Sequence, residues 1–229
     1  MKTLLAFIAL STLGLNARAE MLSMSTPTMY REVALKAGIK ADAFDKVSKY
    51  YAKQFSTVTN KKYISFIDFS YPSTSERLFV LNLKTGKVSK FFVTHGKGSG
   101  ENMATSFSNS PSTNKSSLGL YIIENQYIGK HGASLRLEGL ENGKNISGET
   151  IPDNQIDGIH NGKNSNALAR AIVMHQADYA TESSIANNGG KRLGRSQGCP
   201  AVSPADWKIL RPILKDGSLL LIYKKKNLK

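Results

Sequence analysis

The chain has 229 residues, of which 40% are hydrophobic and 21% charged, and its formal net charge is +14 at pH 7. This length fits one domain, and the composition is that of an ordinary globular protein. The excess of basic residues favours polyanionic surroundings. The chain has no nucleic-acid-binding motif and no aromatic-basic repeat, however, so we do not expect nucleic acid as a partner.

The beginning of the chain has the pattern of a secretory signal peptide. Lys2 is followed by an apolar run over residues 4–10, and residues 17–19 form an A-x-A cleavage site before Glu20. The apolar run is shorter than the ~20 residues that a membrane helix needs, and no later stretch approaches that length. We therefore expect residues 1–19 to be removed and the mature chain to be periplasmic or secreted, without stable membrane insertion. The alternative is a buried N-terminal helix. Export makes an anionic envelope or cell wall the better match to the positive charge.

The first part of the mature chain is expected to be helical. Residues 26–56 have helical spacing, and Gly38 marks a break within them. The apolar residues that recur at this spacing are Ala34, Leu35, Ala41, Phe44, Val47 and Tyr51. We therefore expect an N-terminal helical segment at residues 20–60.

After residue 60 the pattern changes to short β-rich runs, and apolar and polar residues alternate in residues 63–70 and 77–83. The predicted strands are residues 63–70, 77–83, 88–96, 118–124, 134–140, 169–176 and 218–225. Residues 84–87, "KTGK", are predicted to form a hairpin turn. Residues 97–117 are rich in Ser, Asn and Gly and are predicted to form a long loop, of the kind that is usually functional or disordered.

A further helix is predicted at residues 203–214, with Ser203 as its N-cap and Pro204 at its first position. Gly217 lies just beyond this helix, where we expect it to close the helix. Trp207, the only tryptophan, is expected to anchor the helix to the core. Many short strands with glycine-rich connections and few helices indicate a mostly β (α+β) fold, a β-sandwich or barrel-like core with peripheral helices.

Cys199 is the only cysteine, so it cannot form a disulfide within the chain. In an oxidising compartment such a thiol is buried and inert, bonded to another chain, or retained for its reactivity. A thiol attacks a carbonyl as the thiolate, and a nearby imidazole is the usual means of activation. His175 is the best candidate for the base, because it ends the apolar run "AIVMH", and a buried strand would hold its ring rigidly.

The segment between these two residues, 176–198, is long enough for the chain to turn back and bring Cys199 beside His175. Gly198 lets the backbone approach a substrate carbonyl, and the N–H groups of Gly198 and Cys199 could form an oxyanion hole. Either Asp178 or a backbone carbonyl could orient the imidazole.

The stretch "RSQGCPAV", preceded by "RAIVMH", resembles the catalytic signature of the murein L,D-transpeptidases, and most closely the branch whose motif reads R-S-x-G-C-P. The resemblance continues through "THGKGSG", "FSNSPSTNKSSLGLY", "YIGKHGASLRLEGLE" and "GSLLLIY", and so covers about residues 61–223. It implies a mostly β catalytic domain at residues 61–229, with Cys199 as nucleophile and His175 as base. Gln197 departs from the family's usual S-H-G-C form, in which a histidine stands at that position.

The reaction that the resemblance implies is acyl transfer on peptidoglycan stem peptides. Cys199 would attack a tetrapeptide donor and expel the terminal D-alanine, and an amine of a second stem would then resolve the thioester into a 3→3 cross-link. A thiolate with an oxyanion hole needs no metal or other cofactor, and we expect none. Two alternatives are an L,D-carboxypeptidase or exchange enzyme with the same nucleophile, and a cell-wall-binding protein without turnover. We expect a monomer.

Other residues near the motif are candidates for substrate binding. Arg195 could hold a substrate carboxylate in a bidentate pair, or it could pin the loop to the fold. Ser196 is expected to bond backbone groups of the tight turn, beside the substrate. Three residues are expected at the cleft, each with packing or strand capping as the alternative: His95, Tyr121 and, by the resemblance, His131.

The remaining histidine, His160, is expected on a surface loop. The four histidines show no H-x-x-x-H or cysteine-rich spacing that would indicate a metal site.

Overall fold

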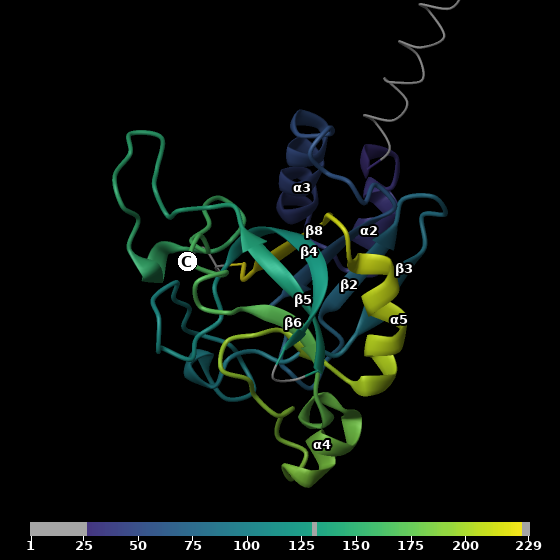
Figure 1. Cartoon of the computed structure of the whole chain (residues 1–229), viewed down its shortest axis with the longest axis vertical. Coiled ribbons are helices and arrows are strands. Elements are labelled where there is room, and N and C mark those ends of the chain that lie inside the picture. The colour runs from purple at the N-terminus through teal and green to yellow at the C-terminus, as the bar shows by residue number, and fades with distance from the viewer. Residues whose placement is uncertain (1–26, 130–131, 226–229) are drawn as a thin grey trace, which may run out of the picture.

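The computed structural model describes residues 27–129 and 132–225 (Figure 1). The expected signal peptide, residues 1–19, lies outside these ranges. A search of the described residues finds no helix that is both long enough and apolar enough to cross a membrane.

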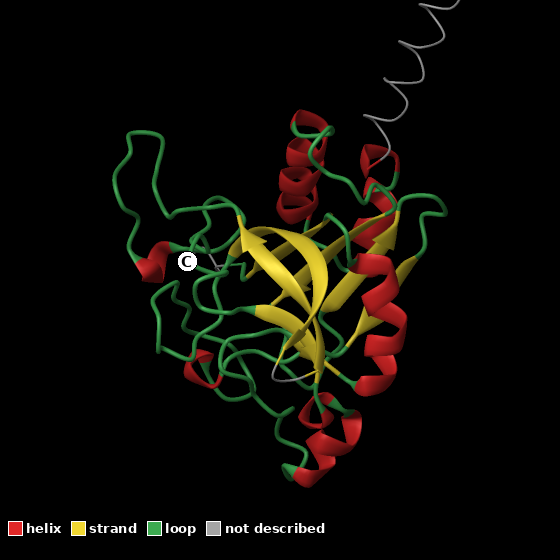
Figure 2. Cartoon of the chain, viewed as in Figure 1, coloured by secondary structure: helices red, strands yellow, loops and turns green. Residues whose placement is uncertain are grey.

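The centre of the molecule is one eight-stranded sheet (Figure 2). In chain order its strands are β1 (Tyr63–Asp68), β2 (Leu78–Asn82), β3 (Val88–Phe91), β4 (Gly119–Gly129), β5 (Gly132–Gly139), β6 (Val173–Gln176), β7 (Ala201–Val202) and β8 (Ser218–Tyr223). Their spatial order is β3-β2-β1-β8-β4-β5-β6-β7. The pairs β1–β8 and β6–β7 are parallel and the others are antiparallel.

Helices surround the sheet. The α-helices are α2 (Arg31–Ala37), α3 (Ala41–Lys53), α4 (Glu182–Asn187) and α5 (Pro204–Leu214). The short 3₁₀ helices are η1 (Lys97–Ser99), η2 (Asp153–Gln155) and η3 (Asp178–Ala180).

Two clusters of buried apolar side chains pack on the two faces of the sheet. The first joins α2 and α3 to the sheet and includes Ala34, Phe44, Val47, Ile64, Phe66, Leu219 and Leu221. The second joins α5 to the sheet and includes Tyr121, Met174, Trp207, Leu210, Leu214, Leu220 and Ile222. Successive residues of β8 alternate between the clusters, which is why every residue of this apolar strand is buried. Cys199 packs against the second cluster, on the side of the sheet that α5 covers.

The structure confirms the mostly β fold with peripheral helices, and with it most of the predicted elements. The break in the N-terminal helical segment is at Gly38, whose φ of +106° is in the left-handed region that glycine tolerates. The C-terminal helix begins at Pro204, and the Ser203 side chain accepts a hydrogen bond from the Asp206 N–H. Trp207 is buried in the core, as expected.

Four expectations about element ends are wrong. The strand predicted to end at residue 124 continues to Gly129 as β4, because it goes on pairing with β5. Gly217 does not close α5, because the helix ends at Leu214 and Gly217 turns the chain into β8, donating its N–H to the Ile123 carbonyl. The strand predicted to reach residue 96 ends at Phe91, because the backbone beyond it pairs with the segment around Cys199 instead of with β2. The strand predicted from residue 169 begins at Val173, after a tight turn.

Candidate active site

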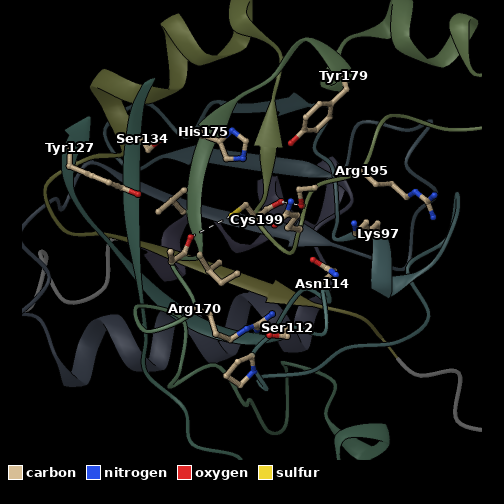
Figure 3. A pocket seen from close by; sticks show the side chains of 16 residues that line it. Lys97, Ser112, Asn114, Tyr127, Ser134, Arg170, His175, Tyr179, Arg195 and Cys199 are labelled. Carbon is tan, nitrogen blue, oxygen red and sulfur yellow. Dashed lines mark hydrogen bonds between the residues drawn. The ribbon is translucent and has the colours of Figure 1, made fainter. Parts of the chain in front are cut away.

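Parallel pairing of β6 and β7 brings the candidate base and nucleophile together. His175 on β6 is in register with Ala201 on β7, two residues after Cys199, and the His175 N–H donates to the Pro200 carbonyl over 3.4 Å. Cys199 and His175 both line one pocket of about 670 Å³ (Figure 3). The structure therefore places the two residues that the sequence singles out in the same cavity.

Backbone pairing holds the cysteine loop, residues 194–200, in place. The Ser196 N–H donates to the His95 carbonyl over 3.0 Å, and the Lys97 N–H donates to the Ser196 carbonyl over 2.8 Å. The Ser196 hydroxyl donates to the Cys199 carbonyl over 2.6 Å and accepts from the Gly198 N–H over 3.0 Å. Ser196 thus bonds the backbone of the tight turn and also lines the pocket.

Gly198 is required by the shape of this loop. Its φ is +128°, and a Cβ there would lie 3.0 Å from both the Lys115 carbonyl oxygen and Ile172 Cδ1. The expected oxyanion hole needs a correction at this position, because the Gly198 N–H is bonded to the Ser196 hydroxyl and so does not point free into the pocket.

The Cys199 thiol is partly buried and donates to the Ala171 carbonyl, with Sγ 3.7 Å from that oxygen. Burial raises the pKa of Cys199 above its ordinary value, while the Val173 N–H and the Arg170 cation act to lower it. Ala171 has a φ of +52°, which is unusual for a residue with a side chain. The turn before β6 therefore aims a carbonyl at the neutral thiol, which needs a base before it can attack.

The His175 ring is oriented by a backbone carbonyl, one of the two possibilities that the sequence left open. Its Nδ1 lies 2.8 Å from the carbonyl oxygen of Gln176, and the ring is only 2% exposed. Because a carbonyl oxygen can only accept, Nδ1 carries the proton of the neutral ring and Nε2 is the basic nitrogen. This tautomer is the one that a general base requires.

Arg195 lines the pocket, but its guanidinium is bonded to the neighbouring loop. Its Nη1 donates to the Gly100 carbonyl over 3.0 Å and to Glu101 Oε1 over 2.6 Å. Glu101 also accepts from Arg192 over 2.9 Å. These contacts match the loop-pinning role that the sequence allows for Arg195.

Two other substrate-binding candidates lie in the interior and do not line the pocket. His95 is fully buried, with its Nδ1 2.7 Å from Arg77 Nη2 and its Nε2 3.2 Å from the Gly100 carbonyl oxygen. Tyr121 is fully buried and donates its hydroxyl to the Ser117 carbonyl over 3.0 Å. Both positions correct the expectation of a cleft-facing side chain, since substrate cannot reach either ring.

The other two histidines lie elsewhere. His160 is on an exposed loop, as expected, with its Nδ1 2.7 Å from Asp157 Oδ2. His131 lies outside the described residues. Within 27–129 and 132–225, no group of three His, Cys, Asp or Glu side chains has the arrangement of a metal site.

Arg170 and Tyr179 are among the pocket residues that escaped the sequence interpretation. Arg170 donates to the Lys115 carbonyl over 2.6 Å and to the Ser108 carbonyl over 2.8 Å, and so ties the long loop to the turn before β6. Tyr179, in η3, lines the pocket with Cys199. The signals in the sequence were a charged residue at the start of the run "RAIVMH" and an aromatic residue four positions after His175.

Comparison with protein families identifies the class of this fold and site. The model of the L,D-transpeptidase catalytic domain matches residues 35–150 and 146–223, which is most of the chain. The chain belongs to this family. A comparison with curated proteins gives no match.

The solved structures that match this chain include three named as L,D-transpeptidases. One from Mycobacterium smegmatis is 11% identical, with a TM-score of 0.38 over 70% of this chain and 58% of that one. One from Xylanimonas cellulosilytica is 13% identical, with a TM-score of 0.36 over 70% of this chain and 60% of that one. One from Stackebrandtia nassauensis is 13% identical, with a TM-score of 0.38 over 82% of this chain and 68% of that one. The chain thus spans less than two thirds of the length of the first two.

Proposed function

We propose that this chain is a peptidoglycan L,D-transpeptidase that acts through a cysteine acyl-enzyme on tetrapeptide stems and forms 3→3 cross-links. The observation that carries the proposal is the shared pocket of Cys199 and His175, which adjacent parallel strands bring together. Membership of the L,D-transpeptidase family supports the same reaction class. Residues 61–229 would form the catalytic domain, and α2 and α3 of the helical segment 20–60 pack on its sheet.

In the proposed reaction, Nε2 of His175 takes the thiol proton and the Cys199 thiolate attacks the carbonyl of the L-centre of the diaminopimelate. The C–S bond forms, the peptide bond to the terminal D-alanine breaks, and the protonated imidazole gives its proton to the departing amine. An amine of a second stem then attacks the thioester and releases Cys199, which leaves the new cross-link.

The charge of the pocket suits an acidic stem peptide. The side chains with a full charge that line it, among the described residues, are all basic: Lys97, Arg170 and Arg195. Stem peptides carry carboxylates, and the summed positive field of the pocket raises their concentration nearby. We place the enzyme in the periplasm or outside the cell, where this substrate is found, and expect it to act there as a monomer.

The test is to incubate the purified mature protein with disaccharide-tetrapeptide and to weigh the products by mass spectrometry, with Cys199→Ala as the control. Cross-linked dimers that are absent with Cys199→Ala are the expected result. Tripeptide or amine-exchanged monomers would show the L,D-carboxypeptidase or exchange activity instead. Unchanged substrate that still binds the protein would identify a wall-binding protein without turnover.

A further inference from the structure

The nucleophile loop does not supply a complete oxyanion hole. Attack on a carbonyl puts negative charge on its oxygen, and enzymes of acyl transfer stabilise that charge with preorganised hydrogen-bond donors. Of the two backbone N–H groups expected to do this, that of Gly198 donates to the Ser196 hydroxyl over 3.0 Å. A further donor from another wall of the pocket would complete the hole.

Tyr179 offers such a donor. It lines the same pocket as Cys199, and its hydroxyl is directed toward the interior of the pocket (Figure 3). Burial, and to a smaller extent the charge of Cys199, raise the pKa of Tyr179 to about 12. The phenol therefore keeps its proton at neutral pH and can donate it in a hydrogen bond.

The backbone of Tyr179 is fixed from two sides. Its carbonyl accepts from the Gly194 N–H over 2.8 Å and from the Ser184 hydroxyl over 2.7 Å. Gly194 is packed so closely that a Cβ there would lie 2.3 Å from Tyr179 Cβ, so only glycine fits. Because Gly194 begins the cysteine loop, this contact sets the position of the phenol relative to Cys199, as a preorganised donor requires.

The cationic groups of the pocket are less suited to this role. The guanidinium of Arg170 is directed at the carbonyls of Ser108 and Lys115, and that of Arg195 at Gly100 and Glu101. The phenol of Tyr179 takes part in no hydrogen bond with another described residue, so it can turn its O–H toward a bound carbonyl.

We propose that the Tyr179 hydroxyl donates a hydrogen bond to the oxyanion that forms when Cys199 attacks the substrate carbonyl. This inference rests on the proposed function. The thiolate forms a bond to the carbonyl carbon, and the π pair moves to oxygen. Tyr179 stabilises that charge without losing its proton. When the intermediate collapses, the C=O bond forms again and the C–N bond to the leaving amine breaks.

Two reactions of Cys199 distinguish stabilisation of the oxyanion by Tyr179 from an effect of Tyr179 on the thiolate or on the shape of the pocket. Acylation by imipenem passes through an oxyanion, whereas alkylation by iodoacetamide forms an S–C bond and expels iodide without one. We expect Tyr179→Phe to slow acylation by about 10²-fold, the usual effect of losing an oxyanion-hole donor, and to leave the alkylation rate unchanged. The control is Tyr50→Phe, which removes a phenol hydroxyl on α3, outside the residues that line the pocket. It should change neither rate.

The results that would overturn the inference differ from the result that would overturn the proposed function. Acylation of Tyr179→Phe at the wild-type rate would overturn the inference while leaving the proposed function standing. An equal loss of acylation and alkylation would also overturn it, since the hydroxyl would then act on the thiolate or on the shape of the pocket. Loss of the native circular dichroism spectrum would show a structural role instead. A wild-type protein that is alkylated but never acylated would remove the proposed function, and this inference with it.

Discussion

The guanidinium of Arg77 lies 2.7 Å from Nδ1 of His95, and both side chains are fully buried. The guanidinium donates, so Nδ1 is the accepting nitrogen, and Nε2 donates to the Gly100 carbonyl. Burial and the Arg77 charge lower the pKa of His95 to about 4, which keeps the ring neutral. Since the His95 carbonyl accepts from the Ser196 N–H, this pair supports the segment after β3 against which the cysteine loop lies.

We therefore predict that His95→Ala acts on stability. Loss of the acceptor leaves a buried N–H of Arg77 unpaired, at a cost of about 1–3 kcal/mol. The pKa of His95 is about 4 in the folded chain and 6.5 in the unfolded chain, so only the unfolded chain binds the proton between these values. Stability should accordingly fall as pH is lowered from 6.5 toward 4, and less steeply in the variant.

The measurement for His95 is urea unfolding at several pH values, with the exposed His160→Ala as the matched control. A His95→Ala protein with wild-type stability and a lower turnover would contradict the prediction and indicate that His95 takes part in the reaction.

His175→Ala should lower turnover of a soluble tetrapeptide donor by about 10²–10⁴-fold, the usual contribution of a general base. The fold should survive, because the strand that carries His175 is held by backbone pairing with β5 and β7. Steady-state kinetics beside His160→Ala, which should keep full activity, provide the comparison. Full turnover in His175→Ala would require another base.

The fold was largely predictable because most of its strands and helices have clear local signals in the sequence. β1, β2 and β8 are apolar runs bounded by turn residues, and α5 begins with a serine cap and a proline. Two of the wrongly predicted ends are set by distant partners: the segment after Phe91 pairs with the cysteine loop, and β6 begins at Val173, where it pairs with Arg136 of β5. The sequence near a strand end does not show which distant segment will pair with it. The two-residue strand β7 exists only through such pairing and has no pattern of its own.

The candidate site was predictable where one residue type is chemically exceptional. Cys199 and His175 stood out because one is the lone thiol, the other ends an apolar run, and both lie in the stretches that carry the family resemblance. The side chains of His95 and Tyr121 each combine an aromatic ring with a polar group, so either could face a pocket or the core. In the structure both are buried in the core. Tyr179 lies in the short 3₁₀ helix η3, and no spacing rule predicts the direction of its side chain.

Arg195 and Glu101 should behave as one unit. Because Nη1 of Arg195 donates to Oε1 of Glu101, we expect Arg195→Ala and Glu101→Ala to lower the melting temperature by similar small amounts. Neither variant should change the KM of a soluble donor peptide. High salt should reduce the stability difference from wild type, since Glu101 is 71% exposed and its pairs are screened. A large rise in KM for Arg195→Ala alone would instead show that Arg195 binds the substrate carboxylate.

The last prediction concerns the charge of Arg170. Burial raises the pKa of Cys199 above its ordinary value and the Arg170 cation acts to lower it, so the alkylation rate with iodoacetamide should keep rising with pH beyond the point at which an ordinary thiol levels off. Arg170→Gln removes the cation, which should shift the profile to higher pH and slow alkylation at pH 7 to 8. Arg170→Lys keeps the charge but loses the fork that holds the Ser108 and Lys115 carbonyls, so its profile should stay near that of wild type. Iodoacetamide is neutral, so the substitutions do not change its attraction to the pocket. If the Gln and Lys variants shift the profile equally, Arg170 acts by holding the loop and its charge has no effect on the thiol.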